Sequence, residues 1–337
     1  MAGIKSKIAE CRQKWENNLK HYVKFKAHST FIDRSKGRKA MCMVLAGYKE
    51  KLYPHTLKRL KMYENEMVDV VILSGKYVAE LDDICKKNMW SYLWTKENDV
   101  SLIQNVAIVN HPKAKYIFKL DEDIFITKDY FEKMFTAYAH CKYGVKTKKD
   151  AYKKLGLVKD DGVLENPNVE PVEYRPGFVA PLIPVNKFGF VRIIKKLDAV
   201  SEYEKKFGCR PMYHDKGVTE DPEFAKFMWG DGGVIPHIDD LNNKFGLNPL
   251  HEAACAIRFS IGAIMFERKL WKEMKGFKVI PFNHRLGIDE EQLNAFCVNN
   301  TYPMMVSENI VVGHFSFGPQ TEGMYEYMDE HPEIFEM

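Results

Sequence analysis

The chain has 337 residues, of which 45% are hydrophobic and 28% are charged, and its formal net charge at pH 7 is +4. This length and composition predict one large or two smaller globular units, and the longest apolar run, residues 41–48, is far shorter than the roughly 18 residues that a membrane span requires. The seven cysteines lack the paired spacing of zinc sites and the first residues lack an apolar signal-peptide core, so we expect a reduced, cytosolic protein.

The two ends of the chain carry opposite charge. Residues 1–39 contain eleven Lys and Arg against three acids, whereas residues 319–337 contain six acids and neither Lys nor Arg. In the basic segment, apolar residues recur every three or four positions, which predicts an amphipathic helix. They are Ile4, Ile8, Cys11, Trp15, Leu19 and Tyr22. We expect this helix to pack on its own domain, and contact with an anionic membrane surface or an acidic partner is the alternative.

From residue 39 onward, short apolar runs alternate with helical patterns, which is typical of an α/β layer with parallel strands. The predicted elements are strands at 41–46, 68–73 and 89–94, helices at 54–63, 81–87 and 100–110, and a fourth strand that ends at Asp121. Pro54 suits a helix start, because its missing N–H costs nothing in the first turn. Ligands of open α/β sheets bind beyond the carboxyl ends of the strands, so we expect a site formed by residues 46–48 and 121–123.

Residues 115–126 read KYIFKLDEDIFI, an apolar strand pattern interrupted by two aspartates. Side chains alternate along an extended segment, so Asp121 and Asp123 would leave the same face with Cα atoms roughly 7 Å apart. Such a pair suits Mg²⁺ or Mn²⁺, which complete their ligand sphere with water and phosphate oxygens. The alternative is a solvated turn after an edge strand.

Residues 143–255 form a long excursion from the alternating pattern. The excursion is Lys-rich at first and is then punctuated by Pro and Gly, before a predicted strand or helix at 178–185, a helix at 191–203 and a loop at 228–240. Recognition is commonly carried by loops on a rigid layer. We therefore expect ligand recognition here, and an insertion that only packs is the alternative.

Regular structure is predicted to resume near the end of the chain. The predicted elements are a segment at 256–266, a helix at 269–275 and an apolar run at 310–312 that ends in Gly313-His314.

Four motifs, in this order, resemble nucleotide-sugar glycosyltransferases of the GT-A fold, in particular the inverting group called family 2. They are VLAGYKE at 44–50, SLIQNVAIVNHPKAKYIFKLDEDIFI from Ser101, ERKLWKEMKGFK at 267–278 and GIDEEQLNAF at 287–296. The resemblance implies an α/β, Rossmann-like mixed sheet flanked by helices. It divides the chain into a helical extension at 1–38, a nucleotide-sugar-binding half at 39–142, an acceptor-binding insertion at 143–255, a half with the base and the metal-binding histidine at 256–318, and an acidic tail at 319–337.

The resemblance also implies roles for particular residues. Asp121, Asp123 and His314 would hold Mn²⁺ or Mg²⁺. Asp289 would take the proton of the acceptor hydroxyl, and Glu290 is the alternative, because Ile288 stands where the family often has Glu. Tyr48 would flank a uracil. The residues implied to bind the donor are Ala46, Gly47, Tyr48, Ser74, Gln104, Asn105, Asp121 and Glu122.

The implied function is metal-dependent transfer of a sugar, with inversion, from a nucleoside diphosphate sugar to an acceptor hydroxyl in glycan or polysaccharide synthesis, with a UDP-sugar as the expected donor. The alternatives are a sugar-nucleotide pyrophosphorylase, a metal-dependent phosphatase and a non-catalytic glycan-binding protein on the same fold. We expect no nucleic-acid partner, because the basic residues lack interleaved aromatics.

Two charged segments have open roles in this interpretation. Lys146, Lys148 and Lys149 are candidates to meet the phosphates of a lipid-linked or phosphorylated acceptor. For the acidic end we expect a solvated tail, and a lid over bound nucleotide is the alternative.

Overall fold

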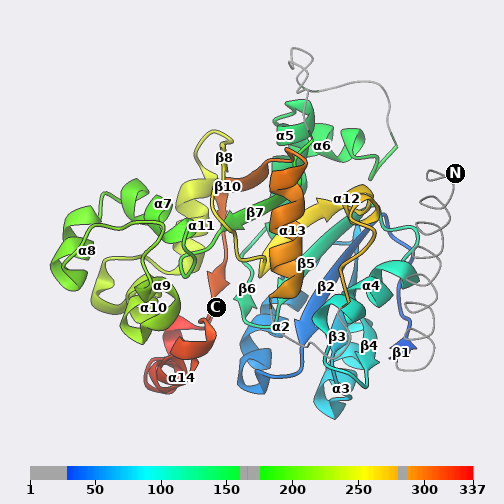
Figure 1. Cartoon of the computed structure of the whole chain (residues 1–337), viewed down its shortest axis with the longest axis horizontal. Helices are drawn as coiled ribbons and strands as arrows, with labels where there is room; N and C mark the ends of the chain where they lie inside the picture. Colours follow the sequence, from blue (N-terminus) through cyan, green and yellow to red (C-terminus); the bar gives the residue numbers. More distant parts are fainter. Residues whose placement is uncertain (1–28, 160–164, 166–174, 280–286, 337) are drawn as a thin grey trace, which may run out of the picture.

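The computed structural model describes residues 29–159, 165, 175–279 and 287–336. The predicted α/β architecture is confirmed for these residues, which form a large, mainly parallel central sheet flanked by helices (Figure 1). The predicted basic helix at 1–38 lies almost wholly outside the described residues. No helix in the described part of the chain is long and apolar enough to cross a membrane.

From β2 to β5, strands and helices alternate in the order that the sequence pattern predicts. The strands are β1 (Ser29–Ile32), β2 (Ala40–Ala46), β3 (Val68–Ser74), β4 (Ser91–Thr95), β5 (Tyr116–Asp121), β6 (Ile124–Phe125), β7 (Phe178–Leu182), β8 (Glu252–Ala254), β9 (Ala263–Glu267), β10 (Met304–Val311) and β11 (Gly313–His314). The α-helices are α2 (Tyr53–Met62), α3 (Ala79–Asn88), α4 (Val100–Asn110), α5 (Tyr130–Tyr143), α6 (Lys148–Lys154), α7 (Gly189–Lys196), α8 (Val200–Phe207), α9 (Gly217–Glu220), α10 (Pro222–Met228), α11 (Ile238–Gly246), α12 (Arg268–Glu273), α13 (Ile288–Asn299) and α14 (Thr321–Glu330). Short 3₁₀ turns lie at η1 (Glu50–Leu52), η2 (Asp231–Gly233), η3 (Gly318–Gln320) and η4 (Pro332–Ile334).

The central sheet has the strand order β1-β4-β3-β2-β5-β9-β7-β10-β8 in the described residues. Strands β2, β3, β4 and β5 are mutually parallel, and β7 pairs in parallel with β10. The short strand β9 joins these two groups by running antiparallel to both β5 and β7. The carboxyl ends of β2, β3 and β5 therefore meet at one edge of the sheet, and polar side chains beyond these ends can converge on one ligand.

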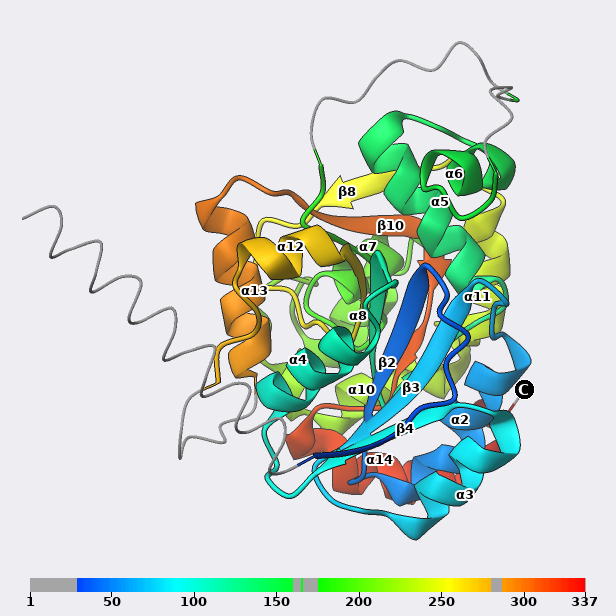
Figure 2. The same ribbon diagram turned by 90° about the vertical axis from the view of Figure 1, so that its right-hand side faces the viewer.

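Helices cover both faces of the sheet. Figure 2 shows α4, α12 and α13 on one face and α2, α5 and α11 on the other. On the α5 side, the buried ring of Phe118 in β5 lies 5.0 Å from the ring of Phe131 and 5.1 Å from that of Phe135. Those two residues are four positions apart on α5 and so share a face. Because helices cover both faces, β5 reads as a continuous apolar run and holds Asp121 at its end on a rigid support.

The structure differs from the sequence-based prediction at four places. The strand β1 was not predicted, since it is four residues long and only half-buried. The predicted helix at 191–203 is two helices, α7 and α8, because Asp198 between them has a φ of 58°. Within the predicted segment at 256–266, only residues from Ala263 onward form a strand. The strand β7, from the predicted insertion, is paired inside the main sheet between β9 and β10.

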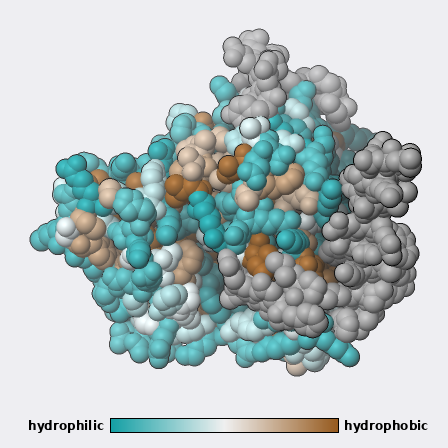
Figure 3. Space-filling view, in the orientation of Figure 1, coloured by the Kyte–Doolittle hydropathy of each residue, from teal (hydrophilic) through white to brown (hydrophobic). Residues whose placement is uncertain are grey.

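The prediction of a solvated acidic tail is wrong. Residues 321–330 form the helix α14, and buried apolar side chains anchor this helix and the turn that follows it. They are Met324, Tyr327, Met328 and Phe335. The acids of the segment are exposed to solvent. The acidic composition therefore did not indicate that the segment packs against the rest of the protein. The face of the molecule seen in Figure 3 is largely hydrophilic in its described part, with hydrophobic side chains in small separate areas.

Candidate active site

A cavity of about 480 Å³ lies at the carboxyl ends of β2 and β5. The other walls are formed by Leu73 and Gly75 at the end of β3, residues 98–100 at the start of α4, residues 260–261, the first turn of α13 and residues 316–318. Among the predicted site residues, Ala46, Tyr48, His314 and five acids line this cavity. The acids are Asp121, Glu122, Asp123, Asp289 and Glu290. The volume is in the range of small-molecule sites, and the hypothesis of a solvated turn at Asp121 is not supported.

Both aspartates line the cavity, but the backbone between them is a turn and not the predicted extended strand. The strand β5 ends at Asp121, and Glu122 and Asp123 form a turn before β6. The alternation of an extended strand therefore does not apply between Asp121 and Asp123. Asp123 is instead held by its neighbours, because its backbone carbonyl accepts a hydrogen bond from the Phe315 N–H at 2.9 Å.

Asp123 faces His314 across the short two-stranded ladder of β6 and β11. Its Oδ2 lies 3.4 Å from His314 Nε2 and is paired with the Lys49 ammonium. Its Oδ1 is buried and has no hydrogen-bond partner in the described residues. Burial alone would raise the pKa of the Asp123 carboxyl, but the charges of His314 and Lys49 outweigh it and lower the pKa below its usual range.

The orientation of His314 is fixed from behind. Its Nδ1 lies 3.0 Å from the carbonyl oxygen of Val185. A carbonyl oxygen only accepts, so Nδ1 carries the proton, and Nε2 faces Asp123. Histidines that bind metals are commonly oriented in this way by a carbonyl. Trp229 in the loop 228–240 adds support, since its Nε1 donates to the backbone carbonyl of His314 at 3.0 Å.

Asp121 is paired with a buried lysine on the same strand. Lys119 Nζ lies 2.6 Å from Asp121 Oδ1 and 3.0 Å from the carbonyl oxygen of Ile261. The Asp121 side chain is 37% exposed, so the carboxylate also faces the cavity. Burial raises the pKa of Asp121 to about 6, against the lowering effect of Lys119 and with a further rise from Asp123.

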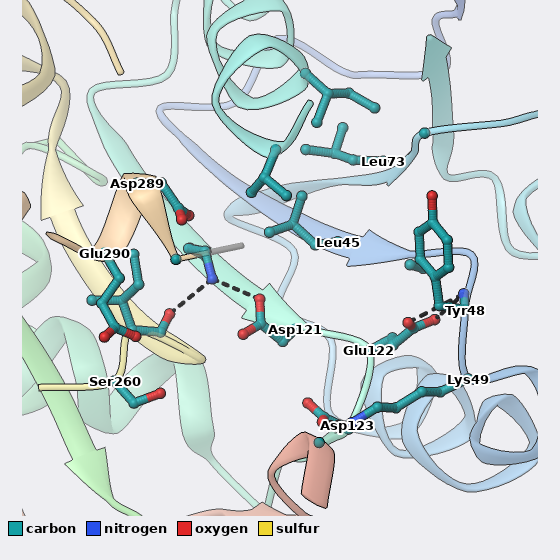
Figure 4. A pocket seen from close by; sticks show the side chains of 18 of the residues that line it. Leu45, Tyr48, Lys49, Leu73, Asp121, Glu122, Asp123, Ser260, Asp289 and Glu290 are labelled. Atoms are coloured by element: carbon teal, nitrogen blue, oxygen red, sulfur yellow. Dashed lines mark hydrogen bonds and ion pairs between the residues drawn. The ribbon is translucent and has the colours of Figure 1, made fainter. Parts of the chain in front are cut away.

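Lys119 links the two acidic sides of the cavity. Although burial lowers its pKa, the charges of Asp121, Asp289 and Glu290 raise it above the ordinary value of lysine. In the view of Figure 4, Asp121 lies between Asp289 on one side and Glu122 on the other. Our sequence analysis missed Lys119, although strand alternation places it on the same face as Asp121.

The two candidate bases lie in the first turn of α13 but have different surroundings. Asp289 is 4% exposed, and its Oδ2 accepts a hydrogen bond from Gln104 Nε2 at 2.8 Å. Glu290 is instead paired with Arg258 Nε at 2.6 Å, and the Arg258 side chain is largely exposed. Asp289 therefore has the fixed, buried setting of the two, while Glu290 belongs to a surface ion pair.

The loop after β2 is clamped by Glu122. The backbone N–H groups of Gly47 and Tyr48 donate to its carboxylate at 2.8 Å and 3.1 Å. Gly47 has a φ of 121°, and a Cβ there would lie 2.4 Å from Ser74 Oγ. Gly47 and Ser74 thus fit together behind the cavity wall, while the Tyr48 side chain, 56% exposed, lies on the cavity side.

The Asn105 side chain connects two segments of the fold through hydrogen bonds. Its side chain bonds to both the N–H and the C=O of Phe277, at 2.8 Å and 2.7 Å, and accepts from Trp271 Nε1 at 2.8 Å. These contacts join α4 to the Gly-Phe turn after α12. The predicted roles of Asn105, Gln104, Ser74 and Gly47 in donor binding remain predictions, since none of the four lines the cavity.

The residues can hold a cation only with help from a ligand. In the described part of the chain, no group of three or more His, Cys, Asp and Glu side chains is arranged to bind a metal. Asp123 and His314 nevertheless fit a divalent ion, because a buried carboxylate oxygen lacks a partner and an oriented imidazole nitrogen faces the same carboxylate. Mg²⁺ and Mn²⁺ sites commonly consist of one or two protein ligands completed by substrate phosphates and water.

No protein-family model and no curated protein matches the chain. Among solved structures, it is similar to the mannosyltransferase PcManGT from Pyrobaculum calidifontis in complex with GDP-Man and Mn²⁺, with a TM-score of 0.39 and 10% sequence identity. The match covers 83% of this chain and 58% of the mannosyltransferase chain. A likeness at this TM-score and identity is too weak to assign a family or an activity.

Proposed function

We propose that the protein is a GT-A glycosyltransferase that moves a sugar from a nucleoside diphosphate sugar, with UDP-sugar as the expected donor, to an acceptor hydroxyl. The observation that carries the proposal is the pairing of two chemical functions in one cavity. Asp123 and His314 form a cation-binding pair on one side, and the buried Asp289 lies in the first turn of α13 on another.

The cation-binding side suits the departing diphosphate. Bound Mn²⁺ or Mg²⁺ would stabilise the negative charge that develops on the diphosphate leaving group. Asp123 and His314 would hold this ion, with Asp121 nearby. Tyr48 offers a half-exposed ring at the cavity wall on which a base can stack.

Asp289 suits the role of general base. Gln104 fixes its carboxylate, and Lys119 compensates the negative charge that gathers between Asp289 and Asp121. The carboxylate would accept the proton of the acceptor hydroxyl as the oxygen attacks the anomeric carbon. Inversion at that carbon is proposed from the resemblance to family 2 alone.

The loop after β2 favours glycosyl transfer over pyrophosphorylase chemistry. A pyrophosphorylase needs backbone N–H groups in this loop for phosphate oxygens. Here the N–H groups of Gly47 and Tyr48 are bonded to the Glu122 carboxylate. A phosphate would have to displace a buried anion that is already satisfied.

The test is a donor panel. Purified protein is incubated with UDP-, GDP- and CMP-sugars in the presence of Mn²⁺, and release of the nucleotide is followed with and without mixed glycan acceptors. We expect release from one class of donor, stimulated by an acceptor and abolished by EDTA. Absence of both donor hydrolysis and transfer across the panel, together with absence of nucleotide binding, contradicts the proposal.

A further inference from the structure

The cation beside Asp123 in this structure belongs to the protein itself. The Lys49 ammonium pairs with Asp123 Oδ2 (Figure 4). The same oxygen faces His314 Nε2. The Lys49 side chain is 22% exposed and that of Asp123 only 7%. The pair therefore lies at the wall of the cavity and is shielded from bulk water. A shielded ion pair is screened less than one on the surface.

The backbone holds Lys49 in this place. The two residues before it, Gly47 and Tyr48, are tied to Glu122 by their N–H groups. Glu122 immediately precedes Asp123 in the chain, so these hydrogen bonds bring the backbone of Lys49 close to Asp123.

An ammonium and a divalent ion are alternatives at this carboxylate. Asp123 Oδ2 is paired with the Lys49 ammonium and lies 3.4 Å from His314 Nε2. The Lys49 ammonium therefore occupies the carboxylate oxygen that faces the histidine. A metal ion bound by the same two atoms would meet the positive charge of Lys49 at close range.

We infer that Lys49 competes with the divalent ion for Asp123 and turns to the donor diphosphate when both bind. The competition between Lys49 and the metal concerns the protein and the ion alone. The move of Lys49 to the diphosphate rests on the proposed function. Lys49 makes nucleotide-free protein a weak metal binder, because the ion must displace an internal ion pair. Diphosphate oxygens give the released ammonium a new partner, so metal and nucleotide bind cooperatively, each raising the affinity for the other by the same factor.

The experiment is a calorimetric titration of nucleotide-free protein with Mn²⁺. Lys49→Gln should bind Mn²⁺ about tenfold more tightly than the unaltered chain, whereas Lys49→Arg, which keeps the charge, should bind it as weakly. Lys51→Gln is the matched control, since Lys51 is two positions away but lies on the surface, 61% exposed and 3.6 Å from Asp329. Thermal unfolding of each variant verifies that it is folded.

A second titration addresses the diphosphate. In the presence of Mn²⁺, Lys49→Gln should weaken binding of UDP and leave that of UMP, which has no β-phosphate, nearly unchanged. An affinity for Mn²⁺ alone that is equal or lower in Lys49→Gln overturns the inference and leaves the proposed function standing. Failure of the donor panel overturns the proposed function, while tighter Mn²⁺ binding by Lys49→Gln still supports the competition.

Discussion

Gln104 Nε2 lies 2.8 Å from Asp289 Oδ2, although the two residues are 185 positions apart. The contact joins the middle of α4 to the first turn of α13, and Gln104 also donates to the Val100 carbonyl at 3.1 Å. Because Gln104 Nε2 donates to both the Val100 carbonyl and Asp289 Oδ2, it holds the Asp289 carboxylate in one orientation. Preorganisation of this kind is what a general base needs, because a misplaced carboxylate loses much of its effect.

The first prediction concerns the base. Asp289→Asn keeps the shape of the side chain and can still accept the Gln104 hydrogen bond, but it cannot take a proton. We expect transfer to fall by about 10² to 10⁴-fold, while the affinity for the donor, measured by titration, stays within about twofold. Glu290→Gln is the matched control and should retain activity, because Glu290 is paired with Arg258 at the surface. Loss of activity in Glu290→Gln with full activity in Asp289→Asn would assign the base to Glu290.

The second prediction concerns the cation site. Asp123→Ala removes the carboxylate that faces both Lys49 and His314. We expect nucleotide binding to lose its Mn²⁺-dependent part, a weakening of about 100-fold, since a bound cation supplies several kcal/mol to a diphosphate complex. Titration of UDP with and without Mn²⁺ measures this. Asp329→Asn is the control, because Asp329 is an exposed acid of α14. An unchanged Mn²⁺ effect in Asp123→Ala would remove the metal assignment.

The sequence predicted the first half of the sheet better than the site that the sheet carries. Strands β2, β3 and β5 were predictable because each is buried on both faces and reads as an apolar run. The ends of these strands then placed Asp121 and Asp123 at the cavity. What the pattern could not show was which charges meet there, because Lys49, Lys119 and Gln104 find their partners through tertiary packing.

The packing of the C-terminal segment was missed for a related reason. Its six acids, with no Lys or Arg, make the segment strongly negative. The packing depends instead on a few spaced apolar residues. Met324 and Phe335, both almost fully buried, belong to this set. Net charge describes the solvent-facing side of such a segment and says little about its opposite side.

The third prediction concerns the loop that carries Tyr48 and Lys49. Gly47→Ala should destabilise the protein by about 3 kcal/mol, because the backbone conformation disfavours any side chain and the new methyl group would meet Ser74. The φ there is 121°, and the Cβ would lie 2.4 Å from Ser74 Oγ. Urea unfolding measures the free energy of unfolding.

Two further glycines serve as controls for this loop. Gly208 has a φ of 70° with no atom within 4 Å of an added Cβ, so Gly208→Ala should cost only about 1 kcal/mol, the backbone part alone. Gly318 has neither a positive φ nor a close neighbour, and Gly318→Ala should be nearly neutral. Equal losses in Gly47→Ala and Gly208→Ala would contradict the predicted clash with Ser74.

The last prediction concerns pH and a buried acid in β10. Glu308 pairs with Arg192, with Lys196 at 2.8 Å and with His251 at 3.0 Å, and its side chain is 4% exposed. Burial alone would raise its pKa, but the hydrogen bonds from Lys196 and Arg192 outweigh it and lower the pKa below the value of 4.5 expected in the unfolded chain. The stabilisation from Glu308 is therefore present above pH 4.5 and is lost as the pH falls through the lower pKa of the folded state.

Glu308→Gln should accordingly destabilise the protein in a pH-dependent way. At pH 7 we expect a loss of about 2 kcal/mol, because two partly exposed cations lose their common partner. Below about pH 4 the difference between the unaltered chain and Glu308→Gln should shrink, since the glutamate is then protonated in the unfolded chain and becomes protonated in the folded one. Urea unfolding at a series of pH values measures the difference, and His251→Asn controls for the second titratable group in contact. A difference that stays constant from pH 7 to acid would show that shape and packing, rather than the charge of Glu308, hold β10 to α7.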